Sequence, residues 1–141
     1  MLKKGFLPKL QEVVLLIKNS FYMTDIPYIY HIVPTTEWAQ AEQVGMYAPA
    51  SINTEGFIHC SKLEQVTGSA QLFFKGQSNL KLLQIIVAKL DARLVYENTT
   101  GGTELFPHLY GSLNLNAVRQ VFDFNTDANG QFVLPDTMGS Q

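Results

Sequence analysis

Apolar residues along the chain fall into short runs separated by turn-forming residues, and this pattern predicts several strands. The most continuous run, residues 82–88, lies in a segment over residues 80–90 that we expect to be a central strand. β-branched and aromatic residues fill positions 27–33 and end at Pro34, which predicts another buried strand. Shorter strands are expected over residues 56–60, 94–97, 118–124 and 132–134, with an extended segment over residues 106–111.

Two segments have the apolar spacing of helices that bury one face. The first is expected to start at a threonine cap, Thr35 or Thr36, and to end at Gly45. The second follows Ser61, which forms with Glu64 the capping pattern S-x-x-E, so that the serine oxygen accepts from a first-turn amide. These are the two main helices that the sequence predicts.

The order of these elements indicates the fold class. A strand, a helix, a second strand and a second helix are followed by four or five strands, and residues 46–54 and 98–102 are expected to be loops. Residues 127–130 form a strong turn signal. This order predicts an α+β domain with mixed or antiparallel strand pairing.

The N-terminal segment differs from the rest of the chain. A lysine pair at positions 3 and 4 and an apolar run over residues 13–17 faintly resemble a signal peptide, but the run is short and no small-residue cleavage site follows. It is also too short to span a bilayer. An amphipathic helix over about residues 8–18 is one interpretation, but we favour an appendage over residues 1–25 ahead of a single domain over residues 26–141.

Composition and charge narrow the classes of partner. The 141 residues suffice for one domain, and 46% hydrophobic with 16% charged residues is typical of globular proteins. A formal net charge of -2 argues against an extended nucleic-acid surface. A single cysteine makes no internal disulfide, so no oxidising compartment is needed and we expect a cytoplasmic protein without a membrane partner.

The stretch over residues 55–61 runs from a short strand directly into the second helix. Alternation along a strand places Phe57, His59 and Ser61 on one face, with Ile58 and Cys60 on the other. The unpaired amides at a helix start favour anions, so this junction is a candidate anion-binding corner beside a histidine. Cys60 is expected to be a small core residue rather than a nucleophile.

The chain has three histidines, His31, His59 and His108, each on or beside a predicted strand. Histidine is the side chain normally poised to change charge near neutral pH, so each is a candidate catalytic residue. The alternative is a buried polar residue bonded to the backbone. A metal site is not expected, because neither H-x-x-x-H nor C-x-x-C occurs and the histidines are far apart along the chain.

Two further positions carry candidate chemistry. Glu97 ends a short strand ahead of a glycine-containing loop, where a carboxylate can orient a hydroxyl or act as a general base, although the pattern alone favours an exposed strand-end charge. Tyr110 stands beside Gly111, and a glycine allows a ligand or a backbone to approach an aromatic ring closely. Trp38, on the first helix, is expected in the core.

Several of these motifs together resemble the uncharacterised bacterial family DUF952. They are Ile-Tyr-His-Ile at residues 29–32, Gly-Phe-Ile-His-Cys-Ser at 56–61, Tyr-Glu at 96–97 and Phe-Pro-His-Leu-Tyr-Gly at 106–111. The resemblance extends over roughly residues 28–124 and leaves the N-terminal segment outside it. That family is in turn similar to the ADP-ribosyltransferase superfamily. The resemblance therefore implies an ADP-ribosyltransferase-like split sheet, with NAD as a substrate bound in a cleft between two small sheets.

The same resemblance implies roles for individual residues. It implies that His31 forms a hydrogen bond with a ribose hydroxyl. His59 and Ser61 would face the ribose or the pyrophosphate, and Glu97 would be the acidic group nearest the reaction. A negative charge there would stabilise an oxocarbenium-like centre. The catalytic residues expected are thus His59, Glu97 and His31, and the ligand-binding residues are Ser61, His108, Tyr110 and Gly111.

The function expected is therefore a nucleotide-binding cleft for NAD or an ADP-ribose-like ligand, with ADP-ribosyl or related transfer or hydrolysis. One alternative is a binding module that keeps the cleft without catalysis. Another is a structural or interaction domain whose histidines are satisfied inside the core. The position of the three histidines separates these alternatives, because an enzyme of this kind needs them in one pocket.

Overall fold

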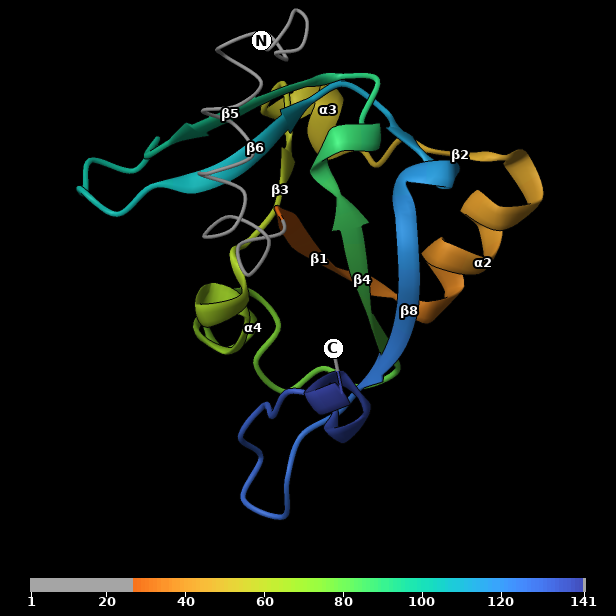
Figure 1. Cartoon of the computed structure of the whole chain (residues 1–141). Coiled ribbons are helices and arrows are strands. Elements are labelled where there is room, and N and C mark those ends of the chain that lie inside the picture. The colour runs from red at the N-terminus through yellow and green to blue at the C-terminus, as the bar shows by residue number, and fades with distance from the viewer. Residues whose placement is uncertain (1–26, 141) are drawn as a thin grey trace, which may run out of the picture.

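A three-stranded antiparallel sheet lies at the centre of the fold (Figure 1). The computed structural model describes residues 27–140. The sheet order is β1-β4-β8, with the predicted central strand in the middle. The strands are β1 (Tyr28–Pro34), β4 (Leu80–Ile86) and β8 (Val118–Phe124).

A second antiparallel sheet has the order β3-β6-β5, and a third consists of β2 and β7. The backbone groups of Tyr30 and Ser61 join the first two sheets through two reciprocal hydrogen bonds, each 2.8 Å long. The strands are β2 (Met46–Tyr47), β3 (Ile58–His59), β5 (Arg93–Glu97), β6 (Phe106–Tyr110) and β7 (Leu113–Asn114).

The two longest helices of residues 27–140 are α2 (Thr35–Val44) and α4 (Val66–Phe73), in agreement with the two main helices predicted. A single turn, α3 (Ser51–Thr54), lies between β2 and β3. Short 3-10 helices complete the fold: η1 (Leu63–Gln65), η2 (Val87–Lys89), η3 (Leu115–Ala117) and η4 (Asp136–Ser140).

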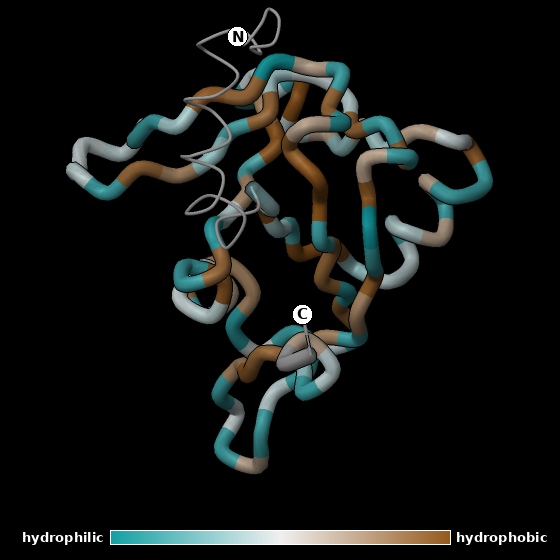
Figure 2. The backbone as a smooth tube through the Cα atoms, viewed as in Figure 1, coloured by the Kyte–Doolittle hydropathy of each residue, from teal (hydrophilic) through white to brown (hydrophobic). Residues whose placement is uncertain are grey.

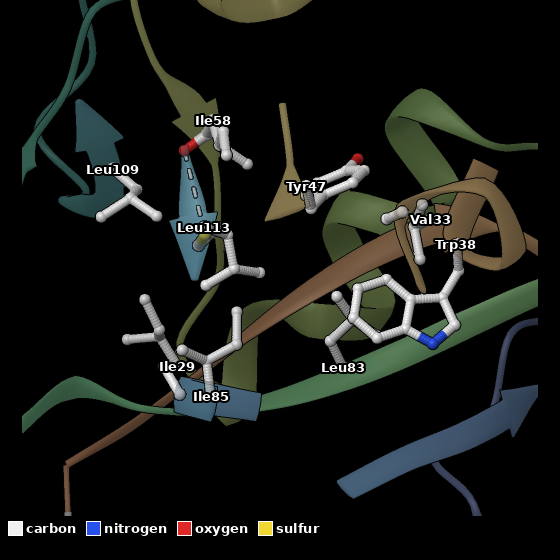
Figure 3. Close-up of a cluster of buried hydrophobic side chains, with 12 residues drawn as sticks. Ile29, Val33, Trp38, Tyr47, Ile58, Leu83, Ile85, Leu109 and Leu113 are labelled. Atoms are coloured by element: carbon white, nitrogen blue, oxygen red, sulfur yellow. Dashed lines mark hydrogen bonds between the residues drawn. The ribbon is translucent and has the colours of Figure 1, made fainter. Parts of the chain in front are cut away.

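The middle strand β4 is buried on both faces, which explains why its apolar run is nearly continuous. Leu83 and Ile85 face a cluster that includes Trp38 of α2, whereas Leu82 faces a second cluster that includes Val66 of α4. The first cluster is drawn in Figure 3, and Figure 2 shows the mostly hydrophobic colouring along β4. The helices thus cover opposite faces, and the expectation that Trp38 is a core residue is confirmed.

Helix starts differ from the predicted caps. Neither Thr35 nor Thr36 caps α2, because Pro34 occupies the cap position and the Thr35 amide donates to the carbonyl of Asn79. The predicted end of this helix is confirmed, since Gly45 has a φ of 89° and its amide closes the last turn.

The prediction of a capping box formed by Ser61 and Glu64 is also wrong. The backbone of Ser61 is held by its pairing with Tyr30, so the 3-10 helix begins only at Leu63. The amide of Lys62 donates instead to Oε1 of Gln65 at 2.9 Å. The capping interaction is therefore shifted one residue along the chain.

Several predicted strands change length. The strand over residues 80–90 ends at Ile86, and that over residues 56–60 is reduced to two paired residues. The strand predicted over residues 132–134 is absent from the described chain, because Phe132 makes only a single bridge, to Thr126. Its ring stacks on that of Phe124. The segment 46–54, expected to be loop, contains β2 and α3.

The α+β class with antiparallel sheets and few helices is confirmed. The predicted appendage over residues 1–25 and the alternative helix over residues 8–18 lie outside the described residues. Over residues 27–140, no helix has both the length and the apolar composition needed to cross a bilayer.

Candidate functional site

One cleft of about 620 Å³ gathers the three histidines. Its walls come from β1, β3 and β6, from the helix α4, and from the loop that follows β5. His31, His59 and His108 all line it, although they lie 28 and 49 residues apart. The geometry therefore brings together the residues whose convergence was the criterion for a functional site.

The short strand β3 sets the direction of His59. Phe57, His59 and Ser61 line the cleft, while Ile58 and Cys60 are buried in the first core cluster. The predicted alternation is confirmed, and so is the core position of Cys60. Burial raises the pKa of the Cys60 thiol to about 12, so it stays protonated at neutral pH.

His31 is held by partners within the fold at both ring nitrogens. Nδ1–H donates to the carbonyl oxygen of His59 at 2.7 Å, and this fixes the tautomer because a carbonyl only accepts. Nε2 then accepts from the hydroxyl of Tyr47 at 2.8 Å. Burial lowers the pKa of His31 to about 4. His31 therefore has no free nitrogen for a ribose hydroxyl, and its contacts fix the backbone of His59.

A chain of side chains leads from Glu97 to His59. Oε2 of Glu97 accepts from Nδ1–H of His108 at 2.9 Å and from the hydroxyl of Tyr110. Nε2 of His108 lies 3.3 Å from Nδ1 of His59. The register of β5 and β6 pairs His108 with Val95, so Glu97, two residues beyond Val95, lies diagonally opposite His108 on the same face of the strand pair.

The direction of these bonds can be assigned from the carboxylate. The hydrogen bonds from Tyr110 and then His108 lower the pKa of Glu97, so it is an acceptor at neutral pH. In the tautomer of His108 that donates Nδ1–H to Glu97 and keeps a lone pair on Nε2, that Nε2 accepts from Nδ1–H of His59. The remaining nitrogen of His59, Nε2, then carries a free lone pair.

That nitrogen has no protein partner. Among the described residues, only Nε2 of His59 and Nε1 of Trp38 are buried side-chain nitrogens without a hydrogen bond. An unpaired buried acceptor costs about 1–3 kcal/mol, so it marks a site where a ligand or water is expected. Burial, followed by the neighbouring His108, lowers the pKa of His59 to about 4 and keeps it neutral.

Aromatic rings surround this imidazole. Phe106 and Phe73 each lie with their ring centroids 5.3 Å from that of His59. Phe57 stacks on His108 at 3.9 Å with an interplanar angle of 13°. These rings make the floor of the cleft apolar and hold the two imidazoles in place.

Ser61 lines the cleft but is engaged with α4. Its Oγ is 2.9 Å from Oγ of Ser69, and both side chains are buried. The amide of Lys62 is occupied by Gln65, as described above. The predicted anion-binding corner thus has neither the expected serine cap nor a free amide at Lys62.

Three expected site residues do not line the cleft. Glu97 and Tyr110 bond to each other behind His108, so they act on the cleft only through that ring. Gly111 has a φ of 146°, and a Cβ there would meet Cβ of Ala92 at 2.9 Å. Its role is therefore close packing of the chain against Ala92 rather than ligand contact.

Other cleft residues were not predicted. Nε2 of Gln65 donates to Oε2 of Glu104 and to the carbonyl of Leu105, at 2.9 Å each, and so ties α4 to the segment before β6. No local pattern identifies such a long-range contact. Phe57 and Phe106, by contrast, flank the histidines in the motifs themselves, and that position was a usable signal.

The residues that the structure describes contain no group of three or more histidine, cysteine or acidic side chains able to hold a metal ion. The cleft chemistry available from these residues is a neutral imidazole acceptor, apolar rings and a few carboxylates. Such a set suits a small organic ligand with a ring and an N–H or O–H donor.

Comparisons with known proteins agree with this picture of a small α+β domain. A family model described as "Protein of unknown function (DUF952)" matches residues 32–121. The crystal structure of protein CC0527 from Caulobacter crescentus is 36% identical, with a TM-score of 0.71, covering 80% of this chain and 99% of that one. The solution NMR structure of CC0527 gives 36% identity and a TM-score of 0.68, covering 81% and 98%.

No curated protein matches the chain. The descriptions of the CC0527 structures do not mention ADP-ribosyltransferases, and the ADP-ribosyltransferase-like part of the predicted fold is therefore not confirmed.

Proposed function

The chain belongs to DUF952, the family that its motifs predicted, and on that premise we propose that its cleft binds a small nucleotide of the NAD or ADP-ribose kind. The observation that carries this proposal is the buried, unpaired Nε2 of His59, a residue that lines the cleft. The Glu97–His108 pair orients that nitrogen as an acceptor, and the rings of Phe73 and Phe106 lie beside the imidazole.

A ring-bearing ligand fits these groups. An amide N–H or a ribose O–H donates to Nε2 of His59, and this bond removes the penalty of the unpaired acceptor. The heterocycle packs against Phe73 and Phe106, where aromatic contacts contribute about 0.5–1.5 kcal/mol beyond burial. His31 contributes indirectly, because its bond to the His59 carbonyl fixes that residue's backbone.

A second candidate function is transfer or hydrolysis of the ADP-ribosyl group. The carboxylate–imidazole–imidazole chain favours it, because that arrangement orients a general base. A water or hydroxyl would pass its proton to Nε2 of His59 while its oxygen bonds to the anomeric carbon. The glycosidic C–N bond would break, and its electron pair would leave with neutral nicotinamide.

The low pKa of His59 ranks the two candidates. An imidazole with a pKa of about 4 accepts hydrogen bonds at neutral pH but is a weak base. Binding is therefore the primary role that we propose, and turnover is secondary. Glu97 serves as a positioning residue in both, because it reaches the cleft only through His108.

Calorimetric titration with NAD and with ADP-ribose tests the proposal. We expect His59→Leu to weaken binding roughly fivefold, because one hydrogen bond contributes about 1 kcal/mol and an apolar side chain cannot accept. Glu42→Gln on α2, away from the cleft, is the matched control and should bind like the wild type. If neither ligand binds, or if His59→Leu binds with unchanged affinity, the proposal is wrong.

The same protein separates binding from turnover. Nicotinamide release from NAD is measured by chromatography, with Glu97→Gln compared to the wild type. Turnover that falls by a larger factor than NAD affinity does in Glu97→Gln supports the catalytic candidate, because a general base depends on the orientation of the imidazole chain more than a single hydrogen bond does. Binding without any nicotinamide release supports the binding module alone.

A further inference from the structure

The charged side chains that line the cleft are all acidic. Glu55, Glu64 and Glu104 are exposed and line it, and no lysine or arginine is among its described lining residues. Carboxylates carry negative charge at neutral pH. A pyrophosphate placed in this cleft would therefore meet like charges without a cation to offset them.

The rings of the cleft complement that charge. Phe73 and Phe106 lie beside His59, and Phe74 also lines the cleft. A positive charge over an aromatic face is attracted by about 0.5–2 kcal/mol, depending on how far it is desolvated. His59 is neutral, so it does not oppose a cation. Carboxylates around aromatic faces are a combination that favours an organic cation.

We propose that the cleft selects a ring-bearing organic cation of the N-alkylated pyridinium class over ligands whose charge is negative. This inference rests on the proposed function, since the same cleft and the same His59 acceptor hold the ligand. In a dinucleotide with a pyridinium ring, the ring enters the cleft and the pyrophosphate stays outside it. ADP-ribose, which lacks the ring cation, binds more weakly.

The test uses 1-methylnicotinamide, a cation, and nicotinamide, its uncharged counterpart, which differ by one methyl group and one charge. Titration calorimetry of the full chain should show the cation binding roughly tenfold more tightly, from the cation–π and carboxylate attractions together. Raising the salt concentration should lower the affinity for 1-methylnicotinamide and leave the affinity for nicotinamide unchanged, because salt screens only the interactions of the charged ligand.

A charge variant identifies the source of the preference. Glu55→Gln, Glu64→Gln and Glu104→Gln together should reduce the affinity for 1-methylnicotinamide by roughly threefold and leave that for nicotinamide unchanged. All three residues are exposed, and a glutamine at position 104 keeps an oxygen that can accept from Gln65, so the fold is retained. Glu42→Gln, an exposed acid outside the cleft, should change neither affinity.

A ring variant tests the aromatic contribution separately. Phe73 is 54% exposed, so Phe73→Leu keeps apolar bulk without disturbing the core. This substitution should lower the affinity for 1-methylnicotinamide by roughly threefold more than it lowers the affinity for nicotinamide.

The outcomes separate this inference from the proposed function. If ADP-ribose binds and 1-methylnicotinamide does not, or if the triple variant binds the cation as the wild type does, the cation preference is overturned while nucleotide binding stands. If the cation binds and neither nucleotide does, nucleotide binding is overturned while the cation preference stands. If none of the ligands binds, both are overturned.

Discussion

Acidification should destabilise this fold through its buried histidines. The pKa values of His31 and His59 are lowered from 6.5 to about 4 in the folded protein, chiefly by burial. Between pH 6.5 and pH 4 the unfolded chain therefore binds more protons than the folded one. By linkage, the free energy of unfolding is largest above pH 6.5 and falls as the pH is lowered through this window.

The size of the effect follows from the two pKa values. For His31, lowering the pH from 7.5 to 5.0 removes about 2 kcal/mol from the free energy of unfolding. His59 contributes less, because it is less deeply buried than His31 and solvent screens it more. The sum, about 3 kcal/mol, is a large part of the roughly 5–15 kcal/mol that stabilises a typical domain.

Urea unfolding followed by the fluorescence of the buried Trp38 measures this loss. Between pH 7.5 and pH 5.0, the free energy of unfolding of His31→Asn should fall by about 2 kcal/mol less than that of the wild type, because an amide does not titrate in this range. Tyr47→Phe removes a bond to His31 yet leaves the imidazole buried, so it should lower stability at both pH values and keep the pH dependence. A wild type equally stable at both pH values would refute the reasoning, as would an unchanged dependence in His31→Asn.

Two further predictions concern packing and reactivity. Gly111→Ala should lower the free energy of unfolding by about 1–3 kcal/mol, because its φ and its approach to Ala92 both disfavour a side chain. Gly68→Ala, inside α4 with open space around it, should instead raise that energy by about 0.5–1 kcal/mol; thermal unfolding compares the two, and equal effects would contradict the account. Cys60 should react with a thiol reagent only as the chain unfolds, because its thiol is buried and protonated; rapid labelling in native buffer would show otherwise.

The sequence predicted those elements whose local signals agree with their environment. β1, β4 and the alternation around His59 are examples, because burial on a face leaves a period-two pattern or a continuous apolar run. Gly45 likewise signals the end of α2 by its backbone conformation alone. The three histidines could be singled out by residue type, and the family motifs placed them in one site.

The remaining features depend on contacts between distant residues. Ser61 looks like a helix cap, yet pairing with Tyr30 fixes its backbone and moves the helix start beyond it. Glu97 looks like a cleft carboxylate, yet His108 stands between it and the cleft. That His31 has both nitrogens occupied depends on Tyr47, which lies in a segment predicted to be loop.

The paired backbone hydrogen bonds between Tyr30 and Ser61 determine how the cleft can open. They lock the two three-stranded sheets together beside the cleft, so these walls move as one stiff body. Widening of the entrance must then come from α4 and the segment after β5, which the Gln65–Glu104 contact holds together. Deuterium uptake should accordingly stay slow at the amides of Tyr30 and Ser61 with or without ligand. Any change in deuterium uptake on ligand binding should be confined to α4 and the segment after β5.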